Sequence, residues 1–261
     1  MKKYIRVYRA IIAMNISYFA TYRANLIAQL AVTVGWTIFQ LIWIFLLTNR
    51  VTSSYGWSRD ELTLFTLGFL FVTGFFHMFF SHNFEDMANI VNKGELDGYL
   101  LRPVDSAFLL TTLRIRISNF ARIIIGGGLI TWWVAAHHIE ISMGSIVTFS
   151  LLMVAGVTLL YAIWMLFCTF LIWYPNLNNL PDFLFSFNNL MRYPTEMFQN
   201  AHNIILTFFL PLMLIVTTPI RFLINKPSYP NAILLILFSI VLFVASRIFW
   251  QFALRSYTSV G

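Results

Sequence analysis

Histidines are the residues in this sequence best suited to metal binding or proton transfer, and their spacing supports neither role. His77 and His82 lie five positions apart, whereas two metal ligands on one helix face lie three or four positions apart. The sequence contains no H-E-x-x-H pattern and no G-x-x-x-x-G-K-S/T loop for nucleotide phosphates. We therefore predict that the chain is not an enzyme and holds no catalytic residue, no metal and no cofactor.

A run of glycines, Gly126 to Gly128, falls inside an apolar stretch. A phosphate-binding loop needs a strand before it and a helix after it. Small residues in an apolar helix instead allow two helix backbones to approach closely. We expect these glycines to lie at a helix–helix contact or to give local flexibility.

Residues 85–104 form a charged stretch between two apolar runs. Residues 85–93 mix charged and apolar side chains as a short helix does, and Gly94 is suited to end that helix. A short charged helix held between two membrane spans can transmit force from a soluble partner. A solvated connecting loop is the alternative, and residue types alone do not separate the two.

The composition predicts that the elements around this stretch lie in a membrane. Of the 261 residues, 59% are hydrophobic and only 10% are charged, and the mean hydropathy is +0.76. Soluble domains are about 45–50% apolar and roughly 25% charged. The chain is therefore predicted to be an integral membrane protein, which excludes most soluble enzymes and binding modules. The net charge of +7 is not taken as a sign of nucleic-acid binding, because in a membrane protein charge placement matters more.

Apolar runs of about 20 residues, the length that crosses a ~30 Å hydrocarbon core, predict the membrane spans. Five runs fit this length, and they comprise residues 26–48, 62–84, 117–136, 145–173 and 232–254. We predict an all-α polytopic fold with six transmembrane helices in a single domain, residues 1–261.

The sixth span must come from the segment between residues 175 and 230, where prolines interrupt the apolar pattern. We favour a short fifth span at about residues 176–193, followed by a re-entrant helical hairpin at residues 194–224. Asparagines near its start leave the beginning of this span open. The alternative is one proline-kinked span at residues 203–223. Pro211 and Pro219 would leave helical pieces of roughly 12 Å, too short to cross alone.

Basic residues predict the orientation. Most of the 17 lysines and arginines fall on the side of the N-terminus when the spans are counted. The positive-inside rule then places both termini in the cytoplasm, with the chain in the inner or plasma membrane. Residues 1–23 place basic and apolar side chains on different helix faces, which predicts an amphipathic helix at the inner membrane surface.

The stretch G-E-L-D-G-Y-L-L-R-P-V, residues 94–104, resembles a pattern in the permeases of type-2 ATP-binding-cassette (ABC) exporters. In that family the pattern follows the second span and includes the helix that docks on the ATPase. The later Tyr193-Pro194, Pro211 and Pro219 are similar to the short fifth span and re-entrant hairpin of the same family. The resemblance extends over the whole chain.

The resemblance implies a permease subunit that moves an amphipathic substrate outward. It implies two copies of a separate ABC ATPase, which would bind the ATP and magnesium, and a second permease that is identical or related. Membrane lipids are expected partners and nucleic acid is not. The predicted coupling region is residues 85–116, and its candidate ATPase-coupling residues are Glu85, Asp86, Asn89, Lys93, Gly94, Glu95, Asp97, Arg102 and Pro103.

The candidate substrate-pathway residues are aromatic or polar residues of the spans: Phe39, Trp43, Phe76, Phe80, Asn188 and Arg192. For each aromatic residue, packing against lipid is the alternative. Two other functions stay open. An intramembrane lipid-modifying enzyme would need converging polar groups, and a secondary transporter would function as a lone chain. Ion-coupled transporters usually bury an acidic residue in a span, and spans one, two, four and six have none in their middle.

Overall fold

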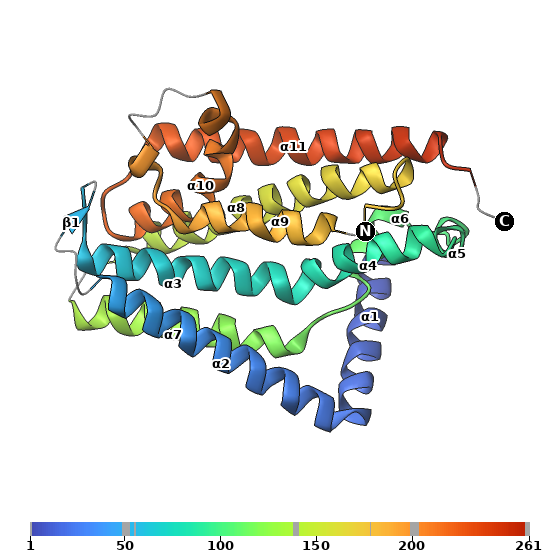
Figure 1. Cartoon of the computed structure of the whole chain (residues 1–261). Coiled ribbons are helices and arrows are strands. Elements are labelled where there is room, and N and C mark those ends of the chain that lie inside the picture. Colours follow the sequence, from blue (N-terminus) through green and yellow to red (C-terminus); the bar gives the residue numbers. More distant parts are fainter. Residues whose placement is uncertain are drawn as a thin grey trace.

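The computed structural model describes residues 2–48, 53–54, 56–137, 141–177, 179–198 and 204–258. Within these ranges the chain is a bundle of long helices that run side by side (Figure 1). Five of the described helices are long and apolar enough to cross a membrane, and they comprise Arg23–Trp43, Arg59–Asn92, Ile117–Ala136, Met143–Ile172 and Tyr229–Arg255. They confirm the predicted all-α polytopic membrane fold.

The first half of the chain builds one side of the bundle. Its elements are α1 (Lys2–Thr21), α2 (Arg23–Thr48), β1 (Ser53–Ser54), β2 (Trp57–Ser58), α3 (Arg59–Phe76), the π-helical turn η1 (His77–Ser81), α4 (His82–Asn92), α5 (Leu96–Leu100), α6 (Ser106–Thr112), the 3-10 turn η2 (Ile117–Asn119) and α7 (Phe120–Ala136).

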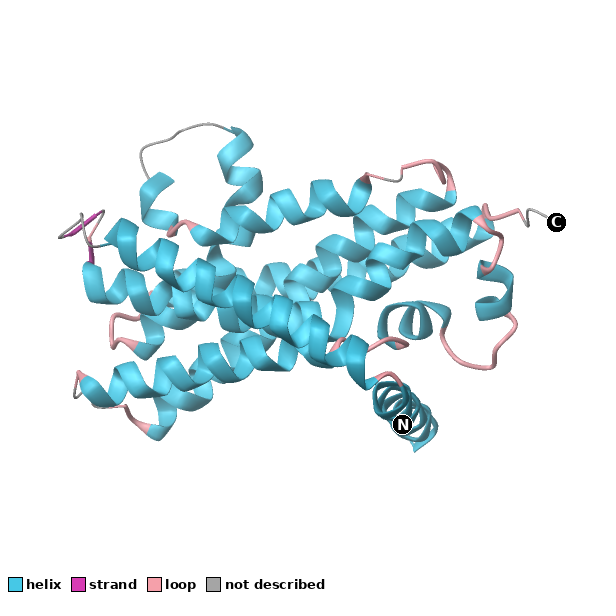
Figure 2. Ribbon diagram, turned by 60° about the horizontal axis from the view of Figure 1, so that its bottom comes forward, coloured by secondary structure: helices cyan, strands magenta, loops and turns pink. Residues whose placement is uncertain are grey.

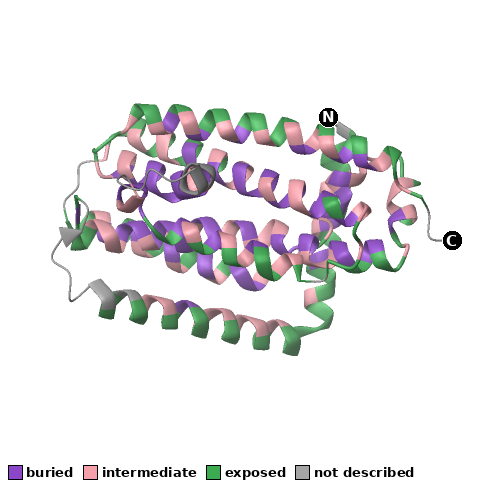
Figure 3. Ribbon diagram, turned by 45° about the horizontal axis from the view of Figure 1, so that its top comes forward, coloured by how far each residue is buried: buried purple, intermediate pink, exposed green. Residues whose placement is uncertain are grey.

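The second half packs along the first. Its elements are α8 (Met143–Thr169), η3 (Phe170–Ile172), α9 (Leu180–Asn188), η4 (Asn189–Arg192), η5 (Thr195–Phe198), α10 (Ile204–Leu223) and α11 (Tyr229–Arg255). Buried residues concentrate on the central helices, whereas α2 is mostly exposed (Figure 3).

The bundle has two distinct ends (Figures 1 and 2). The β-hairpin end carries the short antiparallel pair β1–β2 and the turn between α10 and α11. The α5 end carries α5, α6 and the C-terminal end of α11, and α1 runs crosswise to the long helices there (Figure 1). A helix that crosses the bundle at one end suits the predicted interfacial position of residues 1–23.

The predicted short helix at residues 85–93 is not separate from the second span. A capping box between Ser58 and Glu61 starts α3, and the helix continues through η1 into α4. Gly94 ends it as expected: its φ is +67°, and Glu95 N donates to Ile90 O over 2.9 Å. The second span and residues 85–92 of the charged stretch therefore form one continuous helix.

The fifth span differs from its predicted length. Its helix begins at Leu180, with Pro181 in the first turn, and not near residue 176. The asparagines before Leu180 favour turns rather than helix, which accounts for the later start. Only α9 and η4, residues 180–192, are helical here, so the count of six spans stays a prediction.

The proline-containing segment also differs from expectation in part. Pro211 and Pro219 both lie inside the single helix α10, so they do not divide it into separate pieces. Glu196 Oε1 of η5 lies 2.7 Å from Arg221 Nη2 near the end of α10. This ion pair places η5 and the last turn of α10 at the same end of the bundle, which favours the hairpin. Gln199 lies outside the described residues, and the hairpin stays a prediction.

Glycines allow α3 and α7 to pack closely, as the sequence predicts for Gly126. A Cβ at Gly126 would lie 3.2 Å from the backbone nitrogen of Phe71, and one at Gly74 would lie 3.3 Å from the Arg122 side chain. A Cβ at Gly128 would meet no atom within 4 Å, because this glycine faces open space. Two of the three glycines, Gly126 and Gly127, therefore lie at the helix contact.

We predict that Gly126→Val destabilises the protein and that Gly128→Val serves as its matched control. Both changes replace glycine by valine in the same helix, but only the first forces the side chain against backbone atoms of α3. The expected difference in unfolding free energy is about 1–3 kcal/mol, the usual range for overpacking. Thermal unfolding of the detergent-purified variants measures it, and equal melting temperatures would contradict the described contact.

We also predict that Glu196→Ala destabilises the β-hairpin end. The buried Glu196 carboxylate pairs with Arg221 and accepts a 2.8 Å hydrogen bond from Trp57 Nε1, so its removal leaves two donors without their acceptor. The expected loss is about 1–3 kcal/mol. Glu95→Ala, at an exposed carboxylate of the α5 end, is the control and is expected to unfold like the original chain. A melting temperature for Glu196→Ala equal to that of Glu95→Ala would refute the prediction.

Candidate functional site

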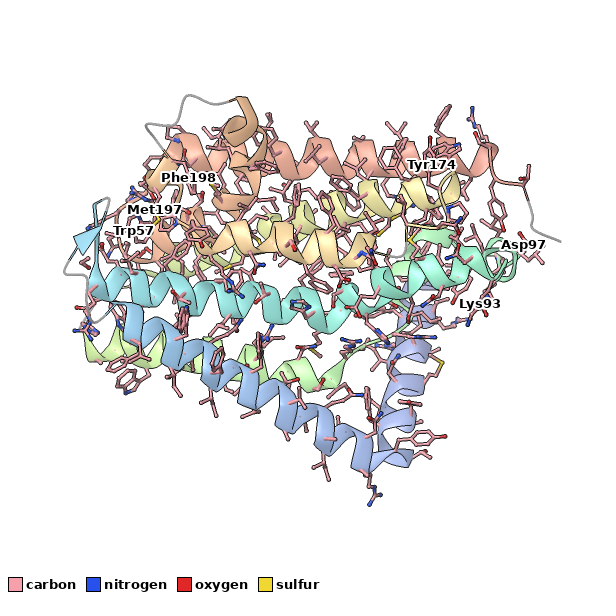
Figure 4. The ribbon with its side chains drawn as sticks, in the orientation of Figure 1. Trp57, Lys93, Asp97, Tyr174, Met197 and Phe198 are labelled. Carbon is pink, nitrogen blue, oxygen red and sulfur yellow. The ribbon has the colours of Figure 1, made fainter. Side chains whose placement is uncertain are left out.

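The α5 end presents an exposed tip formed by residues 93–103. Lys93, Glu95 and Arg102 are exposed there, and Leu101 is 87% exposed. Figure 4 shows Lys93 and Asp97 at this end, far from Trp57 at the β-hairpin end. An exposed leucine among charged residues is the pattern of a protein contact that buries one apolar anchor within a polar rim.

The tip is fastened to the last long helix. Asp105 caps α6 by accepting from Phe108 N over 2.8 Å, and it pairs with Arg247 of α11 at 2.5 Å. Next to this pair, Trp250 Nε1 donates to Ser106 Oγ over 3.2 Å. Residues 105 and 106, just after the tip, are therefore joined to α11.

The C-terminal segment also lies against the tip. Burial raises the pKa of Tyr257, and the Asp97 carboxylate raises it further. Tyr257 follows the last turn of α11, whereas Asp97 belongs to α5. The C-terminal ends of α4 and α11 thus both lie next to α5.

Glu85 and Asp86 point into the protein and pair with arginines of the same chain. Arg116 Nη2 lies 3.1 Å from Glu85 Oε2, and Arg114 pairs with Asp86. His82 lies 3.6 Å from each carboxylate. These carboxylates hold the segment after α6 in place rather than lying free on the surface.

That segment, residues 113–116, is neither helix nor strand, and side chains of other helices bind its backbone. Asn83 of α4 accepts from Arg114 N and donates to Arg114 O, both at 2.8 Å. Asn15 of α1 makes the equivalent pair with Ile115 N and the carbonyl of residue 113. Arg116 N donates to Met78 O within the π-helical turn at 2.9 Å. Residues 113–116 therefore link α1, η1 and α4.

The predicted coupling residues divide into four groups. Glu85 and Asp86 are engaged internally, Gly94 is the helix stop, and Asp97 is half-buried beside Tyr257. The exposed members, which remain available to a partner, are Asn89, Lys93, Glu95, Arg102 and Pro103. Leu101 was not among the predicted residues, although its place between Leu100 and Arg102 in the recognised stretch could have indicated it.

A cavity of about 1080 Å³ lies between α1, α2, α3, α7, α9 and residues 113–116. Polar and aromatic residues from all of these elements line it. Its walls include Val32, which is 73% exposed, so the cavity borders the surface of the bundle at α2. A volume of this size accommodates a ligand larger than a single metal ion or nucleobase.

Positive charge marks the cavity. Arg114, Arg116, Arg122 and Arg192 line it together with two histidines, and the described lining contains no carboxylate. Arg122 belongs to α7 and is 9% exposed. Its stem packs against Gly74 of α3, where the missing side chain makes room for it.

Of the predicted pathway residues, the structure places Asn188 and Arg192 on this cavity and the aromatic ones elsewhere. Phe39 and Trp43 lie exposed on α2. Phe76 is fully buried in the core, and its ring centre is 5.2 Å from that of Trp164.

Phe80 lines a second, smaller cavity of about 420 Å³ on the α8 side of the bundle. The placement of Phe76 differs from expectation because α3 is buried around most of its circumference, so this ring fills the core. The sequence analysis did not identify Arg122 as a lining residue. A charged residue inside an apolar run was the available signal.

The comparisons with known proteins agree with this architecture. The model of the family described as "ABC-2 family transporter protein" matches residues 34–261, which is most of the chain. Neither the curated proteins nor the solved structures give a match. The chain therefore belongs to the ABC-2 transporter family and is a multi-pass membrane permease component of an ABC transporter, a kind of subunit that is not itself catalytic and that associates with an ABC ATPase.

Proposed function

We propose that this chain is the permease subunit of an ABC exporter, which moves an amphipathic substrate outward with ATP hydrolysed by a separate ATPase subunit. In the active complex, two ATPase copies act on two permeases, identical or related. ATP and magnesium bind to the ATPase subunits. Both termini and the α5 end lie in the cytoplasm, where a soluble ATPase can reach the tip.

The exposed tip carries the proposal. Leu101 stands 87% exposed at the end of α5, which follows the continuous helix α3–η1–α4 that begins at the opposite end of the bundle. Asp105 and Arg247 connect the same tip to α11. A partner that binds Leu101 therefore holds two long helices at once, which is the arrangement that transmission of movement into the membrane requires.

Lone-chain functions have less support. The cavity is lined by arginines and amides without a carboxylate in its described lining, so it offers no acidic site for coupling protons or sodium ions. A lipid-modifying enzyme would need a nucleophile or a general base at the cavity. The two lining histidines are instead engaged within the chain: His77 contacts Ser81 Oγ, and His82 contacts Arg116 and the carboxylates of Glu85 and Asp86.

We predict that Leu101→Asp weakens assembly with the ATPase. A charge at an apolar anchor removes its burial on docking, and truncation of such anchors costs about 2 kcal/mol or more in many interfaces. Recovery of the ATPase with the affinity-purified chain is expected to fall at least about tenfold.

Met143→Asp is the matched control because Met143 is also exposed but lies at the start of α8, where an acidic residue suits the helix N-terminus. Its ATPase recovery is expected to stay normal. Both variants should melt at the temperature of the original chain. Normal recovery of the ATPase with Leu101→Asp would show that the tip is not part of the ATPase contact.

We also predict that the purified chain alone does not hydrolyse ATP, since its sequence carries no P-loop. ATP hydrolysis is expected to appear only when the ATPase subunit is added back. Release of phosphate is measured for the chain alone, the ATPase alone and the mixture. Turnover by the chain alone, after removal of contaminating ATPases, would refute the proposed division of labour.

A further inference from the structure

The charges of the cavity are balanced at one end only. The described residues contain eight ion pairs, and Arg114 and Arg116 take part in two of them through Asp86 and Glu85. None of these eight pairs includes Arg122 or Arg192. Two positive charges that line the cavity are therefore left without a carboxylate among the described residues.

Arg122 is the more deeply buried of these two arginines. It lies in the span Ile117–Ala136, it is 9% exposed, and its Nε has no hydrogen-bond partner in the described part of the chain. A buried group normally escapes such a cost by losing its charge, but a guanidinium stays protonated at any physiological pH. Its planar set of N–H donors matches two oxygens of a carboxylate or phosphate.

Asn188 supplies a second donor without a partner. It is 5% exposed, and its Oδ1 accepts from Trp164 Nε1 over 3.2 Å. That bond fixes the amide so that Nδ2 is the free end, and Nδ2 has no partner among the described residues. Two residues that line the cavity thus carry buried donors, one charged and one neutral, that lack an acceptor in the described part of the chain.

Arg192 is held in position by neutral groups. Its guanidinium lies 5.1 Å from the centre of the Phe69 ring, and its Nη2 lies 3.1 Å from the Gln40 amide, which accepts this bond when its oxygen faces Arg192. These contacts orient the charge without cancelling it. Arg192 therefore adds attraction for an anion in the same cavity.

The remaining walls suit a hydrocarbon chain. Trp36 and Phe185 line the cavity, and Val32 reaches from it to the exposed outer face of α2. A molecule with an oxygen-rich anionic group and an apolar tail would satisfy the donors and the aromatic walls together. A small inorganic anion would satisfy only the donors.

We propose that this cavity binds the transported molecule by its anionic group, and that the substrate class is an amphiphile carrying a phosphate or carboxylate. Arg122 forms the central ion pair, Asn188 donates a hydrogen bond, and Arg192 adds long-range attraction. The inference rests on the proposed export function, because it identifies the substrate class for that function.

The test uses the full purified chain in neutral dodecyl maltoside micelles, without ATPase. Three probes are titrated: dodecyl phosphate, inorganic phosphate and dodecyltrimethylammonium. A ligand that binds the folded state raises the melting temperature. Dodecyl phosphate is expected to raise it by several degrees and to change the tryptophan fluorescence, whereas the cationic probe at the same mole fraction does neither.

Arg122→Gln is the decisive variant. Its affinity for dodecyl phosphate is expected to fall at least about tenfold, the effect of losing one charge-assisted hydrogen bond. Arg255→Gln is the control, since it removes the same charge from an exposed position at the end of α11. Without ligand, Arg122→Gln should melt no lower than the original chain, because it removes an uncompensated buried charge.

Three results would overturn the proposal. Unchanged dodecyl phosphate affinity in Arg122→Gln would remove the arginine from the site. Equal binding of the cationic probe would show that only the alkyl chain is recognised. Equal affinity for inorganic phosphate would show that the site takes a free anion rather than an amphiphile. The assay contains no ATPase, so its failure is distinct from a failure of ATPase assembly.

Discussion

The non-helical segment at residues 113–116 is the constraint on which both candidate sites depend. Side chains of α1 and α4 bind its backbone, and the π-helical turn supplies Met78 O as an acceptor for Arg116 N. In a regular α-helix that carbonyl would accept from the helix's own backbone. The π-helical turn leaves it able to accept from Arg116 N. Because α4 leads to the exposed tip and the segment leads into α7, we expect displacement of the tip to move the cavity wall that carries Arg122.

The distribution of charge follows from this arrangement. Carboxylates are few in the chain, and Glu85 and Asp86 are committed to the segment, where they neutralise Arg114 and Arg116. The cavity beyond the segment therefore keeps its positive charge. Buried charges inside a membrane protein are costly and usually face a cavity or a partner. Here the close α3–α7 contact turns Arg122 toward the cavity, and the absence of a side chain at Gly74 accommodates its stem.

Hydropathy alone indicated the fold class and the five long helices, because the requirement to satisfy the backbone in lipid leaves few alternatives. The glycine contact at Gly126 and the helix stop at Gly94 were also predictable, since each depends on a local property of glycine. The cavity was not. Phe76 and Phe80 were expected on the substrate path, but which face of a uniformly apolar helix lines a cavity depends on neighbours distant in sequence. The inward orientation of Glu85 and Asp86 depends likewise on arginines about thirty positions later.

A cryo-EM map of the chain assembled with its ATPase in lipid discs tests the central claim most directly, namely that one rigid frame joins an ATPase-binding tip to an anion-binding cavity. The account predicts that Leu101 is buried against the ATPase and that non-protein density lies against Arg122 Nε and Asn188 Nδ2. A map in which Leu101 is free of the ATPase, or in which a carboxylate of either permease pairs with Arg122, would contradict it.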